Sequence, residues 1–241
     1  MECLYEAKEM RAVTGPAIRP GGLVLTERAL TLCRLPAGAR VLDVGCGVGA
    51  TVEFLSRERG HVAFGVDASY LLLKEGMKEK PNLGLLQASA ETLPFPDRCF
   101  SALFCECVLS LLPDPVSALK EFARVLNPGG FLILSDVYAR MPDEASPLMH
   151  MPVRCCLKGA VGRQQIVTMV QESGLTAILW EDHSALLKQL AGQLIFSFGS
   201  LNAFWAASCS GEAPEVIRET VQRARPGYYL LIARRKGKDD G

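Results

Sequence analysis

Hydrophobic and polar positions along the first 140 residues form two alternating patterns. Short apolar runs are typical of strands buried on both faces of a parallel sheet, and they occupy residues 41–43, 62–67, 83–88, 100–105 and 131–137. Apolar residues at helical spacing occupy the segments 50–59, 69–80 and 116–126. This alternation predicts an α/β fold, with a Rossmann-like, doubly wound and mostly parallel sheet that carries helices on both faces.

The C-terminal third spaces its strands differently. A sixth strand is predicted over 175–180, but the best candidate for a seventh, antiparallel strand is 228–233. Helical patterns in this part cover residues 164–173, 184–208 and 213–224. We therefore expect a seven-stranded sheet with a helical insertion, residues 183–226, before the last strand. The whole chain, 1–241, is interpreted as a single domain.

Two segments outside the predicted strands are candidates for covering a substrate site. Residues 14–22 are rich in glycine and proline and carry Arg19, and a helix is predicted from there to about residue 34. We interpret 1–34 as an N-terminal lid and helix, with an ordered connector as the alternative. The insertion concentrates aromatic side chains, namely Phe196, Phe198, Phe204 and Trp205. Their helical spacing is typical of core packing, and the alternatives are a cover of the substrate cavity or a homodimer surface.

A glycine-rich turn follows the first strand, in the segment Val41-Leu-Asp-Val-Gly-Cys-Gly-Val-Gly49. Its alternating glycines permit positive φ and let a ligand approach the backbone closely. Asp43 places a carboxylate that would repel a pyrophosphate and suit an ammonium group. The spacing Gly45-x-Gly47-x-x-Ala50 also satisfies a dinucleotide fingerprint, so an NAD-type oxidoreductase is kept as an alternative.

Ligands of doubly wound sheets bind outside the carboxyl ends of the strands. Asp67 ends the second strand, 18 residues after Gly49, where a carboxylate can accept hydrogen bonds from ribose hydroxyls. The segments Ser89–Glu91 and Cys105–Glu106 follow the third and fourth strands. We expect these segments to converge with the glycine turn on one site.

The ordered motifs resemble those of class I S-adenosylmethionine-dependent methyltransferases, the group that includes the ubiquinone and menaquinone C-methyltransferases. The resemblance covers about residues 35–140 and rests on the segments 41–49, 65–67, 90–95, 107–114 and 125–130. It implies S-adenosylmethionine as cofactor, S-adenosylhomocysteine as product, and in-line transfer of the methyl group to a small-molecule acceptor. A non-catalytic scaffold that has kept the fold is a further alternative.

The resemblance also implies roles for individual residues around the cofactor. The residues expected there are Asp43, Gly45, Cys46, Gly47 and Gly49 at the methionine part, Asp67 and Ala68 at the ribose, Ser89, Ala90 and Glu91 at the adenine, and Cys105 near the sulfonium. Ser89 stands where the family often has an aspartate, and Ser110-Leu111 stand where many relatives carry a histidine. A histidine-assisted reaction from that position is therefore not expected.

Catalytic residues are not identified by these motifs. The candidates are Glu106, Arg19, Cys155 and Cys156. Glu106 is the nearest carboxylate to the expected methyl group, and its alternative is a solvated loop acid. The segment Cys155-Cys156-Leu-Lys-Gly-Ala160 partly resembles arsenite methyltransferases, which makes a thiophilic substrate an alternative, with Cys105, Cys107, Cys155 and Cys156 as its thiols. A further thiol of those enzymes has no counterpart after Asp67.

Composition changes the picture little. The 241 residues have zero formal net charge, which gives no reason to expect nucleic acid or an anionic membrane as partner. The nine cysteines lack metal-ligand spacing, so no metal is expected and most are interpreted as buried, reduced thiols. No apolar run reaches membrane-spanning length, and charges at the N-terminus do not fit a signal peptide. We therefore expect a cytoplasmic protein.

Overall fold

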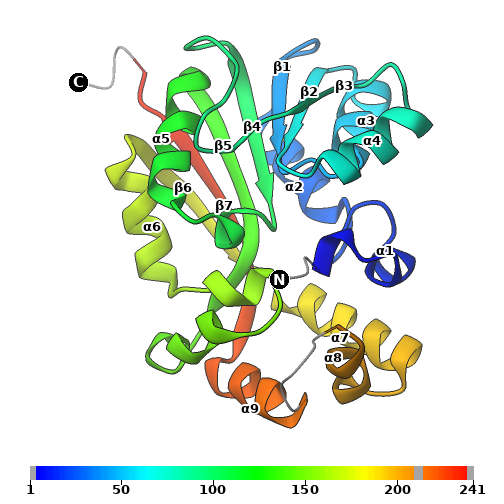
Figure 1. The fold of residues 1–241 in the computed structure, drawn as a ribbon. Helices are drawn as coiled ribbons and strands as arrows, with labels where there is room; N and C mark the ends of the chain where they lie inside the picture. The colour runs from blue at the N-terminus through cyan, green and yellow to red at the C-terminus, as the bar shows by residue number, and fades with distance from the viewer. Residues whose placement is uncertain (1–3, 209–213, 238–241) are drawn as a thin grey trace.

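The computed structural model describes residues 4–208 and 214–237. Within these residues the strands form one seven-stranded sheet in the order β3-β2-β1-β4-β5-β7-β6 (Figure 1). The strands are β1 (Arg40–Val44), β2 (Val62–Asp67), β3 (Gly84–Gln87), β4 (Phe100–Glu106), β5 (Leu126–Ala139), β6 (Leu175–Asp182) and β7 (Pro226–Arg235). The contacts among β1 to β5 are parallel, whereas β7 runs antiparallel to both β5 and β6. The predicted topology is therefore confirmed.

Helices cover both faces of this sheet, as the alternating pattern predicts. The α-helices are α1 (Lys8–Thr14), α2 (Val24–Cys33), α3 (Ala50–Glu53), α4 (Tyr70–Glu79), α5 (Pro115–Val125), α6 (Arg163–Glu172), α7 (Ser184–Phe198), α8 (Leu201–Ser208) and α9 (Pro214–Ala224). Helices α2, α7 and α8 share one buried cluster with Phe104 and Ile133, whereas α5 and α6 share the other with Leu103 and Leu134. Neighbouring residues of a strand thus pack into opposite layers, because successive side chains point to opposite faces.

Short helical turns complete the chain. The 3-10 turns are η1 (Leu4–Glu6), η3 (Leu109–Leu111), η4 (Pro142–Glu144), η5 (Ser146–His150) and η6 (Cys156–Gly159). The predicted helix over 50–59 divides into α3 and a π-helical segment, η2 (Phe54–Glu58). No helix within the described ranges is long and apolar enough to cross a membrane.

Two sequence-based boundaries are wrong. The predicted stop at 127–130 lies inside β5, because the pairing with β4 shifts register there and the extra residues form an irregularity within the strand. The helix predicted over 184–208 is two helices, because Gly199 adopts a φ of +82° and ends α7. The hydroxyl of Ser200 then accepts a hydrogen bond from Ala203 N in α8. The expected helix start at residue 213 lies outside the described residues.

Helix α4 packs directly on the loop after β1. Ser69 caps this helix as its sequence suggests, because its hydroxyl accepts a hydrogen bond from Leu72 N. Gly76 faces the backbone of Val48, and a Cβ at this glycine would lie 2.6 Å from Val48 O. The glycine therefore allows the helix to approach the turn that follows β1.

Two glycine-to-alanine substitutions in helices should have opposite signs. Alanine stabilises a helix interior by about 0.5–1 kcal/mol relative to glycine, and Gly192 in α7 has open space around its missing Cβ. Gly192→Ala should therefore raise the free energy of unfolding in urea. Gly76→Ala should lower it by about 1–3 kcal/mol, the usual cost of overpacking. Equal stabilisation by both substitutions would contradict the close approach of α4 to Val48.

Candidate active site

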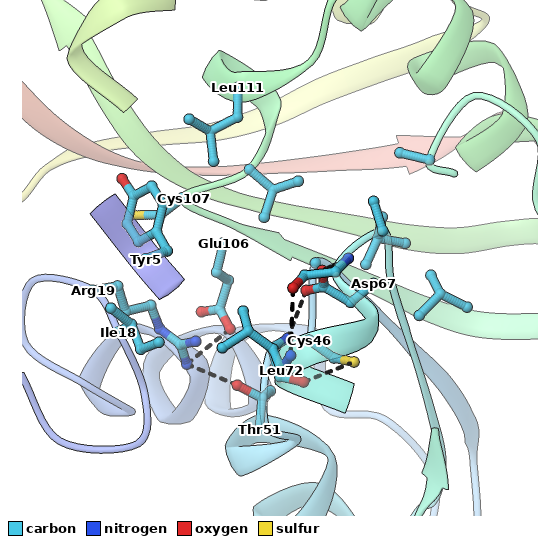
Figure 2. Close-up of a pocket in the computed structure, with 18 of the residues that line it drawn as sticks. Tyr5, Ile18, Arg19, Cys46, Thr51, Asp67, Leu72, Glu106, Cys107 and Leu111 are labelled. Carbon is cyan, nitrogen blue, oxygen red and sulfur yellow. Dashed lines mark hydrogen bonds and ion pairs between the residues drawn. The ribbon is translucent and has the colours of Figure 1, made fainter. Parts of the chain in front are cut away.

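A cavity of about 310 Å³ lies at the carboxyl ends of β1, β2 and β4. Its wall includes nine of the residues singled out from the sequence: Arg19, Gly45, Cys46, Gly47, Asp67, Ala68, Ala90, Glu91 and Glu106. Figure 2 shows how Asp67, Cys46 and Glu106 surround this space together with Arg19 from the N-terminal segment. The predicted convergence of the strand-end loops is thus observed, and the N-terminal segment joins them.

Four of the residues expected at the cofactor do not line this cavity. Gly49 and Ser89 lie in the loops behind its wall, and Asp43 is only 3 % exposed behind the glycine turn. Cys105 is fully buried in the core layer of α5 and α6, because it points to the opposite face of β4 from Glu106. The expected position of Cys105 beside the cofactor is therefore corrected by the alternation of the strand.

The glycine turn is held against β2 by its own backbone. Gly45 N and Cys46 N both donate to Val66 O, at 2.8 and 3.0 Å. Gly45 has a φ of +78°, and a Cβ there would overlap the side chain of Val108, which follows β4. The residue at this position must therefore lack a side chain.

Asp67 joins the turn to the start of α4. Its Oδ2 accepts a hydrogen bond from Gly47 N and its Oδ1 accepts one from Ser69 N, both at 2.8 Å. Burial raises the pKa of Asp67, while these two N–H groups lower it. An ionised carboxyl group has about four acceptor positions, so two bonds leave room for ligand hydroxyls.

The adenine loop predicted after β3 has an internal hydrogen bond. Ser89 Oγ donates to Glu91 Oε2, and Glu91 N donates to Ser89 Oγ at 3.3 Å. Ala90 and Glu91 line the cavity, and the hydrogen bonds with Ser89 hold Glu91 in this wall.

A buried ion pair connects the N-terminal segment to the end of β4. Arg19 Nη2 lies 2.9 Å from Glu106 Oε2, and the two side chains are only 8 % and 1 % exposed. The same guanidinium donates to Gly22 O at 2.9 Å and to Thr51 Oγ1 at 3.0 Å, while Thr26 Oγ1 donates to Glu106 Oε1 at 3.0 Å. The interpretation of Glu106 as a solvated loop acid is therefore wrong.

Asp43 is a second buried carboxyl group near Arg19. Burial first, and then the charge of Glu106, raises the pKa of Asp43 to about 8, although the Arg19 charge opposes this. The Arg19 guanidinium thus interacts with two carboxyl groups, and it forms its direct ion pair with Glu106. These surroundings favour the protonated form of Asp43, whereas the sequence argument took this side chain as negatively charged.

A second, smaller cavity of about 160 Å³ adjoins the first. Tyr5, Ile18, Arg19 and Cys107 line both of them. The aromatic residues of the insertion lie in different environments. Phe204 and Trp205 line the smaller cavity, Phe198 packs edge-to-face on Phe204 at 5.4 Å between ring centroids, and Phe196 is 93 % exposed.

The four thiols proposed for a thiophilic substrate do not gather in one place. Cys107, Cys155 and Cys156 line the smaller cavity, whereas Cys105 lies in the opposite core layer. Cys107 Sγ lies 3.3 Å from Tyr228 Oη, within hydrogen-bond distance. Within the described ranges, no group of three or more His, Cys, Asp or Glu residues has the geometry to hold a metal ion.

Sequence reasoning missed several residues of the site. Tyr5 and Glu6 line the larger cavity, and Glu6 Oε1 accepts a hydrogen bond from Ser69 Oγ at 2.7 Å. No local pattern could place them there, because their partners lie more than sixty residues away.

Comparisons with known proteins agree with this arrangement. Residues 42–134 match the family described as "Methyltransferase domain". The chain is 27 % identical over 222 residues to the methyltransferase GfsG of Streptomyces halstedii, with 87 % of this chain and 78 % of that protein covered. It is 34 % identical over 142 residues to an uncharacterised methyltransferase, YodH, of Bacillus subtilis (strain 168), with 56 % and 59 % covered. The fold and the domain match together indicate a methyltransferase domain.

Solved structures show the same fold. The Haemonchus contortus phosphoethanolamine N-methyltransferase 2 in complex with S-adenosyl-L-methionine superposes with a TM-score of 0.70 at 18 % identity, over 95 % of this chain and 56 % of that one. At this identity the likeness concerns the fold alone. The domain match, the methyltransferase relatives and the shared fold all agree with a class I S-adenosylmethionine-dependent methyltransferase.

Removing one partner of the buried ion pair should be costly. Arg19→Met leaves the Glu106 carboxylate buried without its counter-charge, and we expect the free energy of unfolding to fall by about 3–5 kcal/mol. The matched control is Arg28→Ala, which breaks the exposed pair with Glu181 and should cost about 0–1 kcal/mol. Urea denaturation at pH 7 measures both.

The double variant Arg19→Met/Glu106→Gln sharpens this prediction. It leaves no unpaired charge at the end of β4, so it should be less destabilised than Arg19→Met alone. A loss below about 1 kcal/mol for Arg19→Met would show that the ion pair contributes no more than a surface pair does.

Proposed function

We propose that the 310 Å³ cavity binds S-adenosylmethionine and that the chain transfers its methyl group to a small-molecule acceptor. The observation that supports this most is the convergence of the glycine turn, Asp67 and the Ala90–Glu91 loop on one cavity. The cavity volume lies at the lower end of the usual range for ligand sites, about 300–1,000 Å³. A bound cofactor would therefore occupy most of it.

The residues present fit this cofactor. Asp67 has free acceptor positions for ribose hydroxyls, and Ala90 and Glu91 border the space where an adenine would lie. The backbone at Gly45 and Gly47 forms the part of the wall nearest to Asp43, which suits the methionine portion. Gly49 and Ser89 support this wall from behind by shaping the turn and by bonding Glu91.

S-adenosylmethionine supplies an electrophilic methyl group on a sulfonium: the acceptor's lone pair takes the methyl, the carbon–sulfur bond breaks, and the sulfur keeps the electron pair as a thioether. Ile18, Val108 and Leu111 provide apolar wall that excludes water. Glu106 is held by Arg19 and Thr26, so it is not placed as a free base. The chain therefore contributes mainly proximity and orientation, which supply up to about 7–11 kcal/mol in favourable cases.

No histidine stands among the described residues of the cavity wall. No general base is therefore assigned, and an acceptor with an available lone pair needs none. Arg19 is assigned a positioning role because its contacts with Glu106 and Thr51 hold the N-terminal segment over the strand ends. The N-terminal segment up to residue 34 thus acts as a cover of the site.

Titration calorimetry tests the cofactor directly. S-adenosylhomocysteine should bind in the micromolar range, and NAD should not bind. Asp67→Asn removes a charged acceptor and should weaken binding of S-adenosylhomocysteine about 10- to 100-fold, since a hydrogen bond to a charged group contributes about 1.5–3 kcal/mol. Asp97→Asn, at an exposed carboxylate, is the matched control. Binding of NAD but not of the adenosyl ligand would overturn the proposal.

A turnover assay separates an enzyme from a scaffold. Protein incubated with S-adenosylmethionine labelled in its methyl group should transfer the label to small molecules of a cell extract. Label that stays on the cofactor while S-adenosylhomocysteine binds normally would support a non-catalytic scaffold.

Binding should also release protons at neutral pH. The pKa of Asp43, about 8 in the protein alone, will fall when the cofactor's ammonium group binds nearby, because an opposite charge favours the ionised form. At pH 7 the side chain therefore loses a proton on binding. The heat of S-adenosylhomocysteine binding should differ between Tris and phosphate buffers, which take up protons with different enthalpies. The Asp43→Asn variant should show no such difference, and an unchanged difference would contradict this role.

The same pKa predicts the pH dependence of stability. The folded-state pKa of Asp43 lies above the unfolded value of 3.8, so the unfolded chain loses this proton at lower pH than the folded one. The stability contributed by the protonated form is present below about pH 4 and is lost as the pH rises towards 8. Asp43→Asn should therefore make the free energy of unfolding depend less on pH between 4 and 8 than in the unmodified chain.

A further inference from the structure

The smaller cavity lies next to the larger one, and the two share Tyr5, Ile18, Arg19 and Cys107 as common wall. This shared wall is where a molecule in the smaller cavity comes nearest to the larger one. The inference rests on the proposed function, because it takes the larger cavity as the place of the cofactor.

Most of the wall of this cavity is apolar. Leu190 and Leu194 of α7 and Phe204 and Trp205 of α8 are all buried there. The helical insertion therefore supplies a hydrophobic cover over this side of the sheet. Burying an apolar ligand surface against such a wall is favourable by about 25 cal/mol per Å².

Two polar groups of the wall, the Tyr5 hydroxyl and the Cys107 thiol, already have partners. Tyr5 Oη accepts a hydrogen bond from Cys156 N at 3.1 Å, and Cys107 Sγ lies 3.3 Å from Tyr228 Oη. Arg19 is the one charged residue among those lining the cavity, and its guanidinium is paired with Glu106. An anionic ligand would have to break that buried pair, because the described wall offers no second cation.

The volume sets the size of the ligand. The cavity measures about 160 Å³, and an apolar cavity of about 150 Å³ in a protein core stays dry and binds benzene. The space therefore suits one six-membered ring or a branched aliphatic group of similar size.

We propose that the smaller cavity binds the apolar body of an uncharged methyl acceptor, about the size of one aromatic ring, with the accepting atom at the wall formed by Ile18 and Cys107. A phosphate group is not expected inside the smaller cavity, because Arg19 is the one cation of its described wall and is paired with Glu106. The acceptor class thus differs from the one named in the phosphoethanolamine N-methyltransferase that shares the fold.

Binding to protein saturated with S-adenosylhomocysteine tests this. Phenol, as a neutral one-ring probe, should bind with millimolar or better affinity, as measured by calorimetry or by ligand-observed NMR. Phenyl phosphate and phosphoethanolamine should bind at least 10-fold more weakly. Failure of phenol to bind, or equal binding of phenyl phosphate, would overturn the proposal.

A filling substitution locates the ring. Ala191→Phe adds a ring at the wall of the smaller cavity and should weaken phenol binding at least 10-fold while the affinity for S-adenosylhomocysteine stays within about twofold. Ala206→Phe makes the same change at an exposed position of α8 and should alter neither. Unchanged phenol binding by Ala191→Phe would contradict the assignment of the cavity.

An enlarging substitution gives a second test if Ala191→Phe does not fold. Leu194→Ala opens the wall, and 1-naphthol should gain affinity relative to phenol at least threefold. No change in this ratio would overturn the proposed place of the ring. Failure of the proposed function can be told apart from failure of this proposal. If the unmodified chain does not bind S-adenosylhomocysteine, the proposed function is wrong, and this is measured before any ring probe is added.

Discussion

The buried ion pair between Arg19 and Glu106 holds the site together. Charged groups of this kind are expensive to remove from water, and their desolvation is offset only by good geometry and additional hydrogen bonds. Thr26, Thr51 and the Gly22 carbonyl supply those bonds. Because Arg19 belongs to the N-terminal segment and Glu106 ends β4, the pair fastens a distant segment to the carboxyl edge of the sheet (Figure 2).

This connection shapes both cavities. The segment beside Arg19 places Ile18 in the wall between them, and the guanidinium itself lines both. Glu106 neutralises the positive charge of Arg19, so the described wall of the smaller cavity has no unpaired cation that would attract an anion. Burial raises the pKa of Asp43 most, the Glu106 charge raises it further, and the Arg19 charge lowers it. The charges of Arg19 and Glu106 therefore act on both the cofactor side and the acceptor side of the proposed site.

The two sides differ in how far they could be predicted. Asp67, Gly45 and Gly47 lie at or directly after strand ends, so the parallel-sheet rule placed them on one cavity. Cys105 was misplaced because a one-residue step along β4 reverses the side chain's direction, and the resemblance to a family could not show which neighbour faces the site. The acceptor side is built by α7 and α8, whose break at Gly199 and packing on the sheet depend on long-range contacts.

Local periodicity and the ordered motifs therefore determined the seven-stranded α/β fold, the helical insertion and the positions of Gly45, Gly47 and Asp67, because each depends on neighbours in the chain. Only the tertiary structure decided that Glu106 is buried against Arg19, that Tyr5 enters the wall, and that Phe204 and Trp205 cover a cavity while Phe196 faces solvent. These features depend on which segments far apart in sequence pack together, and a pattern of single residues carries no record of such pairing.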